Sequence, residues 1–371
     1  MRNPLIFWGV LSLLQLLWAF IGLGTHHYAK LIHPNVGKTW WWVVAAVVVG
    51  DVLMCAFNYW LPSLRWRGTM GLLLFSHYAA LFTLFWLAYY HLSRWLFSSS
   101  WTQQSIIYGM PLLWLCLIGA GLYYAYTPRT VYHEVSVNKP MSRPIKIALV
   151  SDTHLGTFIG KHHLQALQEI IAREQADILL LAGDVMDDLP DQYRHLNMHP
   201  HMQSLSAPLG KYVVLGNHDN YRKVQGDIVS DLQDAGFTVL RDESVVVHEQ
   251  LLLVGRRDHV EQRLSADALL SAHSLPVVVM DHQPVGPQIQ ALADHGADLI
   301  VSGHTHAGQI FPLTALIGQF QTYPYGHYQI DDAHLVVTSG LGLWGLPFRL
   351  GTQSEVAIVT LSSQHKCSAP C

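Results

Sequence analysis

Residues 145–154 read Ile-Lys-Ile-Ala-Leu-Val-Ser-Asp-Thr-His, and this stretch decides the fold of the second half of the chain. The apolar run from Ile145 to Val150 is typical of a short buried strand. The run ends directly in Asp152 and His154, two side chains of the kind that bind metal ions. A buried strand followed at once by such side chains predicts an α/β domain with its functional loops at strand ends.

The same arrangement recurs along the chain. Four more strand-like runs each end in polar motifs: 177–182 before Gly183-Asp184, 210–215 before Gly216-Asn217-His218-Asp219, 276–280 before Asp281-His282, and 299–302 before Gly303-His304-Thr305-His306. An amphipathic pattern over 165–173 predicts a helix between the first two strands. Alternating strands and helices indicate a layered α/β domain. The segment 244–254 is strand-like without a helix between its parts, and it predicts a second, more antiparallel sheet.

The motifs together supply carboxylates, one amide and several imidazoles, which is enough to hold two divalent cations. Gly183, Gly216 and Gly303 precede three of these groups, and glycine allows the close backbone approach of a crowded site. Each motif alone is weak, but five in a fixed order after five strands are a strong signal. Two metals held close together are a device for hydrolysing phosphate esters.

In these motifs the chain resembles the calcineurin-like metallophosphoesterase family, whose pattern is DxH, GD, GNH[DE], H and GHxH. The resemblance covers about residues 145–362 and implies a four-layer αββα sandwich. It extends to a bacterial membrane-associated phosphodiesterase branch through three segments: 207–212 (Ala-Pro-Leu-Gly-Lys-Tyr), Gly308-Gln309, and 340–350 with its Gly-Leu-Pro-Phe-Arg sequence. Ala307 departs from the Gly common in that branch, which is a minor steric change.

The resemblance implies two divalent metal ions, Mn²⁺, Fe or Zn²⁺, and a role for each motif residue. One metal takes Asp152, His154 and His306, the other takes Asn217, His282 and His304, and Asp184 bridges both. His218 is implied to contact the phosphate and protonate the leaving oxygen, and Asp219 to orient His218. The expected reaction is hydrolysis of a phosphodiester or pyrophosphate by a bridging hydroxide.

Several other polar residues have no motif support. We expect His162 and His163 to lie at the surface, Asp187 and Asp188 to be solvated, and Arg349 to be structural. His327 and His334 also lie outside every motif. A competing interpretation, a metal-binding interaction module with little catalysis, is disfavoured because Asn217, His218 and Asp184 are all intact.

Residues 1–127 are almost continuously apolar and aromatic, and they predict a four-helix transmembrane bundle. Its expected spans are residues 5–23, 41–60, 70–90 and 106–126. Tryptophan and tyrosine side chains such as Trp60 gather at their ends, as in a membrane-interface belt. A linker is expected over 128–144, and a polar tail with Cys367 and Cys371 over 363–371.

The positive charges favour both termini in the cytoplasm. The resemblance to the bacterial membrane-associated branch implies that the membrane is a bacterial inner membrane. The fused spans then favour a lipid-linked phosphate ester as substrate. Asp51 lies within the second span, where a carboxylate is a candidate functional group, with His77 as a possible partner. An alternative function is therefore a small transporter or sensor that works through Asp51 and is regulated by the phosphoesterase domain. The small net charge of -4 and the lack of a basic stripe do not favour nucleic-acid binding.

Overall fold

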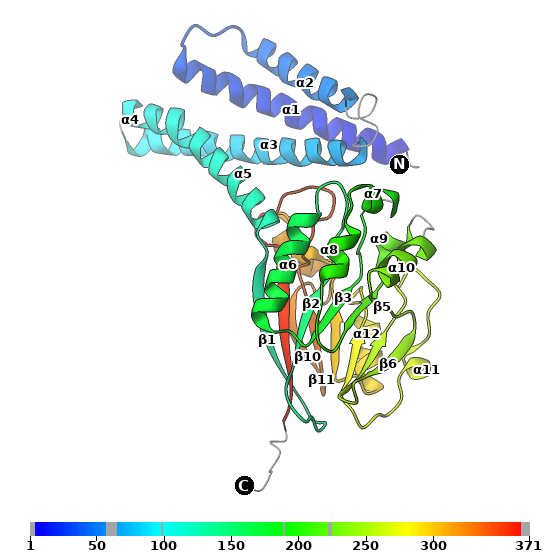
Figure 1. Ribbon diagram of the computed structural model, residues 1–371. Helices are drawn as coiled ribbons and strands as arrows, with labels where there is room; N and C mark the ends of the chain where they lie inside the picture. The colour runs from blue at the N-terminus through cyan, green and yellow to red at the C-terminus, as the bar shows by residue number, and fades with distance from the viewer. Residues whose placement is uncertain (1–3, 57–64, 98, 188–189, 222–224, 365–371) are drawn as a thin grey trace. The chain divides into compact units, whose positions relative to one another are not determined.

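The computed structural model describes residues 4–56, 65–97, 99–187, 190–221 and 225–364. The chain divides into two compact units, Met1–Ala120 and Gly121–Cys371. The first is helical and the second carries all the sheets (Figure 1). The expected aromatic residue Trp60, the charges at Arg2 and Asp188, and the tail cysteines lie outside the described residues.

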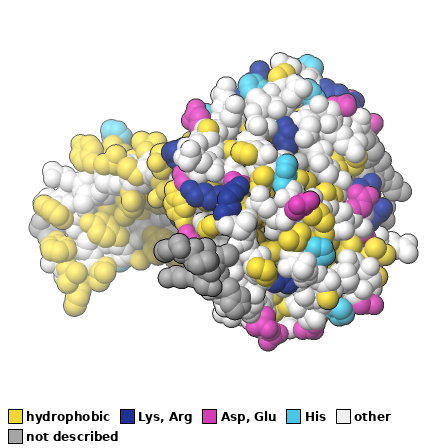
Figure 2. Space-filling view, turned by 60° about the horizontal axis from the view of Figure 1, so that its bottom comes forward, with side chains coloured by type: hydrophobic (Ala, Val, Ile, Leu, Met, Phe, Trp, Pro, Cys, Tyr) yellow, Lys and Arg dark blue, Asp and Glu magenta, His cyan; other side chains and the backbone are white. Residues whose placement is uncertain are grey.

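The first unit is built from long apolar helices: α1 (Pro4–Ile32), α2 (Thr39–Cys55), α3 (Arg65–Leu96), and a continuous run of α4 (Ser99–Gln104), the π-helical turn η3 (Ser105–Gly109) and α5 (Met110–Tyr126). Hydrophobic side chains crowd its surface, at the left of Figure 2, whereas charged side chains are scattered over the other unit. Two helices, Gly71–Leu96 and Ser100–Tyr126, are long and apolar enough to cross a membrane. Thr39–Cys55 is apolar but shorter, and the remaining predicted spans stay predictions.

Asp51 has a hydrogen-bonding partner inside the helical unit. The side-chain amide of Gln15 donates to its Oδ1 over 2.7 Å, and this pairs α1 with α2. The expected partner His77 lies on α3, and its ring contacts Tyr78. The Gln15 contact explains Asp51 as a helix-packing residue, because a hydrogen-bonded carboxyl can join two helices in apolar surroundings.

The second unit contains two six-stranded sheets (Figure 1). The first sheet has the order β1 (Arg129–Val137), β12 (Glu355–Ser363), β2 (Ile145–Val150), β3 (Ile178–Ala182), β4 (Lys211–Val214) and β5 (Thr238–Val239). The second has the order β10 (Gly326–Ile330), β11 (Ala333–Val337), β9 (Leu299–Ser302), β8 (Val277–Met280), β7 (Leu251–Gly255) and β6 (Glu243–Val247). Strands β2, β3 and β4 are parallel neighbours, and so are β7, β8 and β9.

Helices cover the outer face of each sheet. The longer ones over the first sheet are α6 (Lys161–Glu174), α7 (Pro190–His195), α8 (His199–Ser204) and α10 (Gln225–Asp234); those over the second are α11 (Ala266–Leu269) and α12 (Gly286–Asp294). A third core fills the space between the sheets. The result is a four-layer αββα arrangement, as expected from the resemblance.

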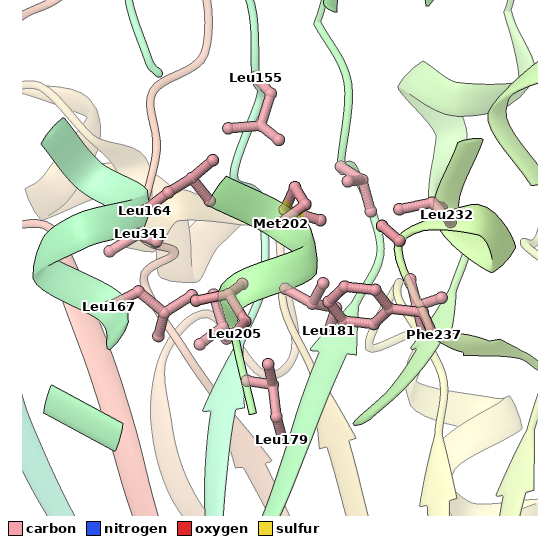
Figure 3. Close-up of a cluster of buried hydrophobic side chains, with 14 of the residues drawn as sticks. Leu155, Leu164, Leu167, Leu179, Leu181, Met202, Leu205, Leu232, Phe237 and Leu341 are labelled. Carbon is pink, nitrogen blue, oxygen red and sulfur yellow. The ribbon is translucent and has the colours of Figure 1, made fainter. Parts of the chain in front are cut away.

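The core under α6 shows why this layer forms. Leu164 and Leu167 recur at helical spacing and pack on Leu179 and Leu181 of β3, with Met202 of α8 beside them (Figure 3). Each leucine is at most 1% exposed, and burying such a side chain contributes about 1.5–3 kcal/mol. The helix therefore spans Lys161–Glu174, a few residues beyond the predicted range at its start.

The strands predicted from the motifs are all present, within one residue at each end. The second sheet exists, and it has antiparallel pairs at both edges, β6 with β7 and β10 with β11, around a parallel centre. The stretch 128–144, expected to be a linker, instead contains β1, which runs parallel to β12. Its prolines, Pro128, Pro140 and Pro144, lie just outside the strand, where they do not interrupt its pairing.

The end of α5 belongs to the second unit. The Ser354 hydroxyl donates to the Ala125 carbonyl over 2.7 Å, and the Arg349 amide donates to the Gly121 carbonyl over 3.1 Å. Ala125 itself is fully buried in the core beneath α6. The unit boundary therefore falls inside a helix, about six residues before the predicted position at 127.

Candidate metal centre

The predicted metal-binding side chains converge at the carboxyl ends of the strands. Asp152 and His154 follow β2, Asp184 follows β3, and Asn217 and His218 begin the short helix α9 (Asn217–Asn220) after β4. His282 follows β8, and His304 and His306 follow β9, where η4 (His306–Gly308) begins. Because the two sheets are packed face to face, these loops meet along one end of the sandwich.

One cluster combines Asp152, His154 and His306, all buried. The Nε2 atoms of His154 and His306 lie 3.1 Å apart. Asp152 Oδ1 lies 3.5 Å from the His306 nitrogen and 4.0 Å from the His154 nitrogen. Three potential ligand atoms from two loops, those after β2 and β9, thus surround one point.

A second cluster combines Asp184, His282 and His304. Asp184 Oδ2 lies 3.3 Å from His282 Nε2, and Asn217 Oδ1 lies 3.1 Å from the same nitrogen. The rings of His282 and His304 have centroids 5.2 Å apart. The other ring nitrogen of His282, Nδ1, faces the Ala182 carbonyl at 2.8 Å, which leaves Nε2 free to bind a cation.

Asp184 connects the two clusters. Its Oδ2 atom lies 3.3 Å from His282 in the second cluster and 3.8 Å from His154 in the first. A single carboxylate oxygen between two sets of ligands is the arrangement expected of a bridging ligand in a two-metal site.

The donor set fits transition-metal cations. Two nitrogens that each lie about 2.1 Å from one cation, at a right angle, are about 3.0 Å apart. The 3.1 Å separation of the His154 and His306 nitrogens matches this value. Carboxylate, amide and imidazole ligands with no thiolate suit Mn²⁺, Fe or Zn²⁺.

Comparison with known proteins agrees with this geometry. A family profile described as calcineurin-like phosphoesterase matches residues 145–308. An uncharacterized metallophosphoesterase of Aquifex aeolicus is 32% identical over 250 residues, which cover 64% of this chain and 94% of that protein. The chain belongs to the calcineurin-like metallophosphoesterase family.

Two further relatives show how far the likeness reaches. An uncharacterized metallophosphoesterase of Helicobacter pylori is 32% identical over 235 residues, which are 61% of this chain and 62% of that protein. A Danio rerio protein described as a transmembrane protein with a metallophosphoesterase domain is 28% identical over 256 residues, or 64% of this chain and 58% of that protein. The matched region thus spans less than two thirds of both relatives.

The phosphoesterase site holds several residues in strained backbone. Asp152, His154, Asp184, His304 and His306 all have left-handed φ angles, between 44° and 71°. For residues other than glycine each such conformation costs on the order of 1 kcal/mol, and it persists where the surrounding structure enforces it. These loops are therefore shaped by the site rather than by local preference.

Glycine is required beside the site at two positions. A Cβ atom at Gly216 would collide with the Asp184 carboxylate, and one at Gly303 would collide with Ser151 and Asp152. Both glycines let a neighbouring strand end approach the candidate ligands, as the sequence predicted.

His218 stands at the entrance of the phosphoesterase site. Its backbone amide donates to Asp184 Oδ1 over 2.8 Å, which fixes its loop against the bridging residue. Its ring stands edge-on to His154, with centroids 4.8 Å apart. Its Nδ1 atom lies 3.6 Å from Asp187 Oδ1.

Asp187 is the functional residue that sequence reasoning missed. We expected it to be solvated, yet its side chain is only 13% exposed and lies 3.6 Å from the Nδ1 atoms of both His218 and His154. The available signal was its position three residues after Asp184, on the loop that leaves β3. A carboxylate at this distance interacts electrostatically with both imidazoles.

Asp219 has a different role from the one expected. Its carboxylate accepts hydrogen bonds from the backbone amides of Val185, Met186 and Gly216 over 2.9–3.1 Å. The expected contact with His218 is not among the contacts of the described residues. Asp219 instead fastens the loop after β4 to the loop after β3. Burial and the nearby Asp184 charge raise the pKa of Asp219 to about 6, against the effect of the three amide donors.

The charges around Asp184 keep it ionised. Burial alone would raise its pKa, but the imidazoles of His282, His154 and His218 outweigh burial and hold the pKa well below its usual range. Burial alone would likewise lower the pKa of His282, yet the Asp184 carboxylate raises it well above normal. An ionised carboxylate is the form that binds a cation.

A cleft of about 300 Å³ opens onto the centre. On one side it is lined by Asp184, Asn217, His218, His304 and His306, and on the other by apolar side chains that include Leu313, Ile317 and Trp344. The cleft is therefore polar at its floor and apolar at its rim.

Two more expectations were decided by the structure. Arg349 is fully buried and donates through Nη2 to the carbonyls of Ser339, Gly340 and Gly342, so it is structural as expected. His163, expected at the surface, is 1% exposed, and its Nε2 faces the Ala125 carbonyl at 3.2 Å. Burial lowers the pKa of His163 to about 4.

Proposed function

We propose that the protein is a membrane-anchored, dinuclear-metal phosphodiesterase or pyrophosphatase that acts on a lipid-linked substrate. One observation carries the proposal: Asp184 Oδ2 lies between two three-residue clusters at the floor of a cleft. Asp152, His154 and His306 would hold one cation, and Asn217, His282 and His304 the other, with Asp184 shared. The bound cations would lower the pKa of a water molecule and offset charge on the phosphate oxygens.

The chain's own residues supply positioning and proton transfer. His218 is 20% exposed, at the mouth of the cleft, so its imidazole can reach the leaving oxygen of a bound ester. Protonation of that oxygen is general acid catalysis, which contributes on the order of 10²–10⁴-fold. Asp187 holds the His218 ring through Nδ1, which directs Nε2 into the cleft.

The rim of the cleft supports the lipid-linked part of the proposal. We define the apolar rim as the cleft-lining residues Leu313, Ile317 and Trp344 together with three exposed apolar residues near the first two in sequence, Phe311, Leu316 and Phe320. It includes α13 (Leu313–Leu316) and η5 (Ile317–Gln319), and Phe320 is 72% exposed. Exposed apolar side chains beside a polar catalytic floor suit a substrate with a phosphate head and a hydrocarbon chain.

The segment that carries Trp344 also contacts the end of α5. The Arg349 amide donates to the Gly121 carbonyl, and Phe348 fills the space beside Gly121. The helical run that ends there is one of the two with the length and composition to cross a membrane. The Gln15 contact of Asp51 leaves the transporter or sensor interpretation without a specific observation in its favour.

The catalytic proposal is tested with the full-length protein in detergent, stripped of metal and then supplied with Mn²⁺, Zn²⁺ or Mg²⁺. We expect metal-dependent hydrolysis of bis-p-nitrophenyl phosphate at a higher rate than p-nitrophenyl phosphate. Asp184→Asn should abolish it, while Asp191→Asn, at a side chain 90% exposed, should not. Equal rates of Asp184→Asn and wild type would contradict the proposal.

The lipid proposal needs a second comparison. Phe320→Ser should raise KM for a nucleotide-lipid pyrophosphate in mixed micelles and leave hydrolysis of bis-p-nitrophenyl phosphate unchanged. Tyr132→Ser, at a side chain 61% exposed on β1, is the matched control. Equal loss on both substrates would show that Phe320 supports the fold rather than a lipid chain.

Membrane placement is tested separately. We propose a multi-pass protein of the inner membrane with its catalytic unit in the cytoplasm, as the positive charges favour. Protease added to sealed inside-out membrane vesicles should digest the catalytic unit. Protection in such vesicles, with digestion in right-side-out ones, would reverse the orientation.

A further inference from the structure

Three histidines that belong to none of the motifs lie close together at one edge of the two sheets. His133 lies on β1, the edge strand of the first sheet. His327 lies on β10, the edge strand of the second sheet, and His334 lies on its neighbour β11. The two sheet edges come together here, because the rings of His133 and His327 have centroids 5.9 Å apart.

The strand register places all three side chains on the sheet faces that look toward the other sheet. His133 alternates with Val135 and Val137, which belong to the core between the sheets. His334 lies two residues before Val336, a member of the same core. His327 neighbours Tyr328, which packs against the opposite, outer face, and His327 itself is exposed to solvent at the sheet edge. The half-buried His133 and His334 occupy positions that normally carry apolar side chains.

The spacing of the histidines repeats that of the candidate metal centre. His327 Nε2 and His334 Nδ1 lie 3.0 Å apart, against 3.1 Å for the nitrogens of His154 and His306. The ring centroids of His327 and His334 are 5.1 Å apart, the same separation as in the His154 and His306 pair. The rings of His133 and His327 have centroids 5.9 Å apart, so His133 has to rotate toward the pair to share a metal ion with it.

The chemistry of the three groups suits a transition metal. Burial lowers the pKa of both His133 and His327, and the neighbouring imidazoles lower that of His327 further. The lowered pKa values favour the neutral form of His133 and His327, which is the form that binds metal. A set of imidazoles suits Zn²⁺, Ni²⁺ or Cu²⁺ rather than Mg²⁺ or Mn²⁺, which prefer oxygen.

We propose that His133, His327 and His334 form a second metal site, which takes one Zn²⁺, Ni²⁺ or Cu²⁺ ion and joins the edges of the two sheets. His327 and His334 supply the preformed pair, and His133 adds the ligand from the other sheet. Water fills the remaining coordination positions, since His327 is exposed to solvent. The site does not depend on the proposed phosphodiesterase activity.

Zn²⁺ binding to the full-length protein, prepared without a polyhistidine tag, tests the proposal. After equilibrium dialysis, metal analysis should find one Zn²⁺ fewer per chain in His327→Ala and in His133→Ala than in wild type. His248→Ala, at an exposed histidine on the turn between β6 and β7, should equal wild type. An unchanged circular dichroism spectrum without added metal shows that each variant is folded.

A second readout follows the join between the sheets. Zn²⁺ should raise the Tm of wild type and of His248→Ala, with a smaller rise in the His327 and His133 variants. Equal Zn²⁺ content in all four proteins would overturn the proposal and leave the His327–His334 contact a simple hydrogen bond. Loss of Zn²⁺ in His327→Ala but not in His133→Ala would show that His133 is not a ligand, and it would contradict the proposal that the metal joins the two sheets.

Discussion

The loops that follow the first sheet and those that follow the second supply different side chains to the candidate metal centre. The first sheet provides every oxygen ligand, from Asp152, Asp184 and Asn217, with one imidazole, His154. The second provides imidazoles alone, from His282, His304 and His306. Neither set is complete, because His306 completes the first cluster and Asp184 completes the second.

This difference means that the centre exists only when the sheets are packed together. The contact surface between them is the apolar core that includes Ile147, Leu180, Val278 and Val301. Metal binding and the packing of the two sheets are therefore coupled, and a bound cation stabilises the whole sandwich. Each of the three predictions below compares two residues that the structure places in different roles.

The largest expected effect on activity and metal content comes from replacing Asp184, which both clusters share, and it is compared with replacing His304, which belongs to one cluster. Asp184→Asn removes a carboxylate from both clusters and should lower activity on the order of 10⁴-fold, with both cations lost. His304→Ala touches only the second cluster and should retain one cation of the two. Metal content and turnover are measured on the same samples. Equal metal loss in both variants would contradict the assignment of Asp184 to both clusters and of His304 to one.

Replacing either of two carboxylates on the loops after the first sheet should have a smaller effect, on turnover for one and on stability for the other. Asp187→Asn should lower turnover about 10–100-fold with little change in Tm, because Asp187 positions His218 and His154. Asp219→Asn should cost about 1–3 kcal/mol of stability, because three buried amides lose a charged acceptor. Kinetics and thermal unfolding of both variants test this, and the opposite pattern would exchange the two roles.

The smallest effect lies in the helix layer over the first sheet. The pKa of His163 is about 4 in the folded protein, below the ordinary value of 6.5, so the unfolded chain binds the proton more tightly. Stability from this group is present above pH 6.5 and is lost as the pH falls toward 4. The loss at pH 5 is about 2 kcal/mol.

His163→Gln keeps a donor near the Ala125 carbonyl and cannot be charged, so it should flatten the fall in Tm between pH 7 and pH 5. His162→Gln, at the exposed neighbouring residue, is the control and should follow wild type. A wild-type slope in His163→Gln would assign the acid sensitivity to other groups, such as the candidate ligands.

The parts of the fold that the sequence predicted are those with strong local patterns. Runs such as 145–150 and 299–302 are apolar throughout, which marks strands buried on both faces, and each was found in place. Strand β1 was not predicted from the sequence because its apolar positions are interrupted by His133 and flanked by prolines. Its partner β12 lies more than 200 residues away, and no local pattern shows that pairing.

The candidate site likewise contains residues that the sequence predicted and contacts that it did not. The structure brings together each residue named from the motifs, because every one directly follows a buried strand. The partners of His218 were not predictable by the same reasoning. Asp219 is adjacent in sequence, yet its side chain turns toward Val185 and Met186, whereas Asp187 arrives from another loop. Such second contacts depend on how loops pack, which the sequence alone does not encode locally.

The position of β12 has a consequence for how the chain is made. This strand, Glu355–Ser363, lies between β1 and β2, although it follows every other described strand in the sequence. Helices near the start of the chain emerge from the ribosome more than 200 residues before it. The first sheet therefore stays open, with the facing edges of β1 and β2 unpaired, until β12 has been synthesised. Chaperones should be needed most during this interval, while those edges are exposed.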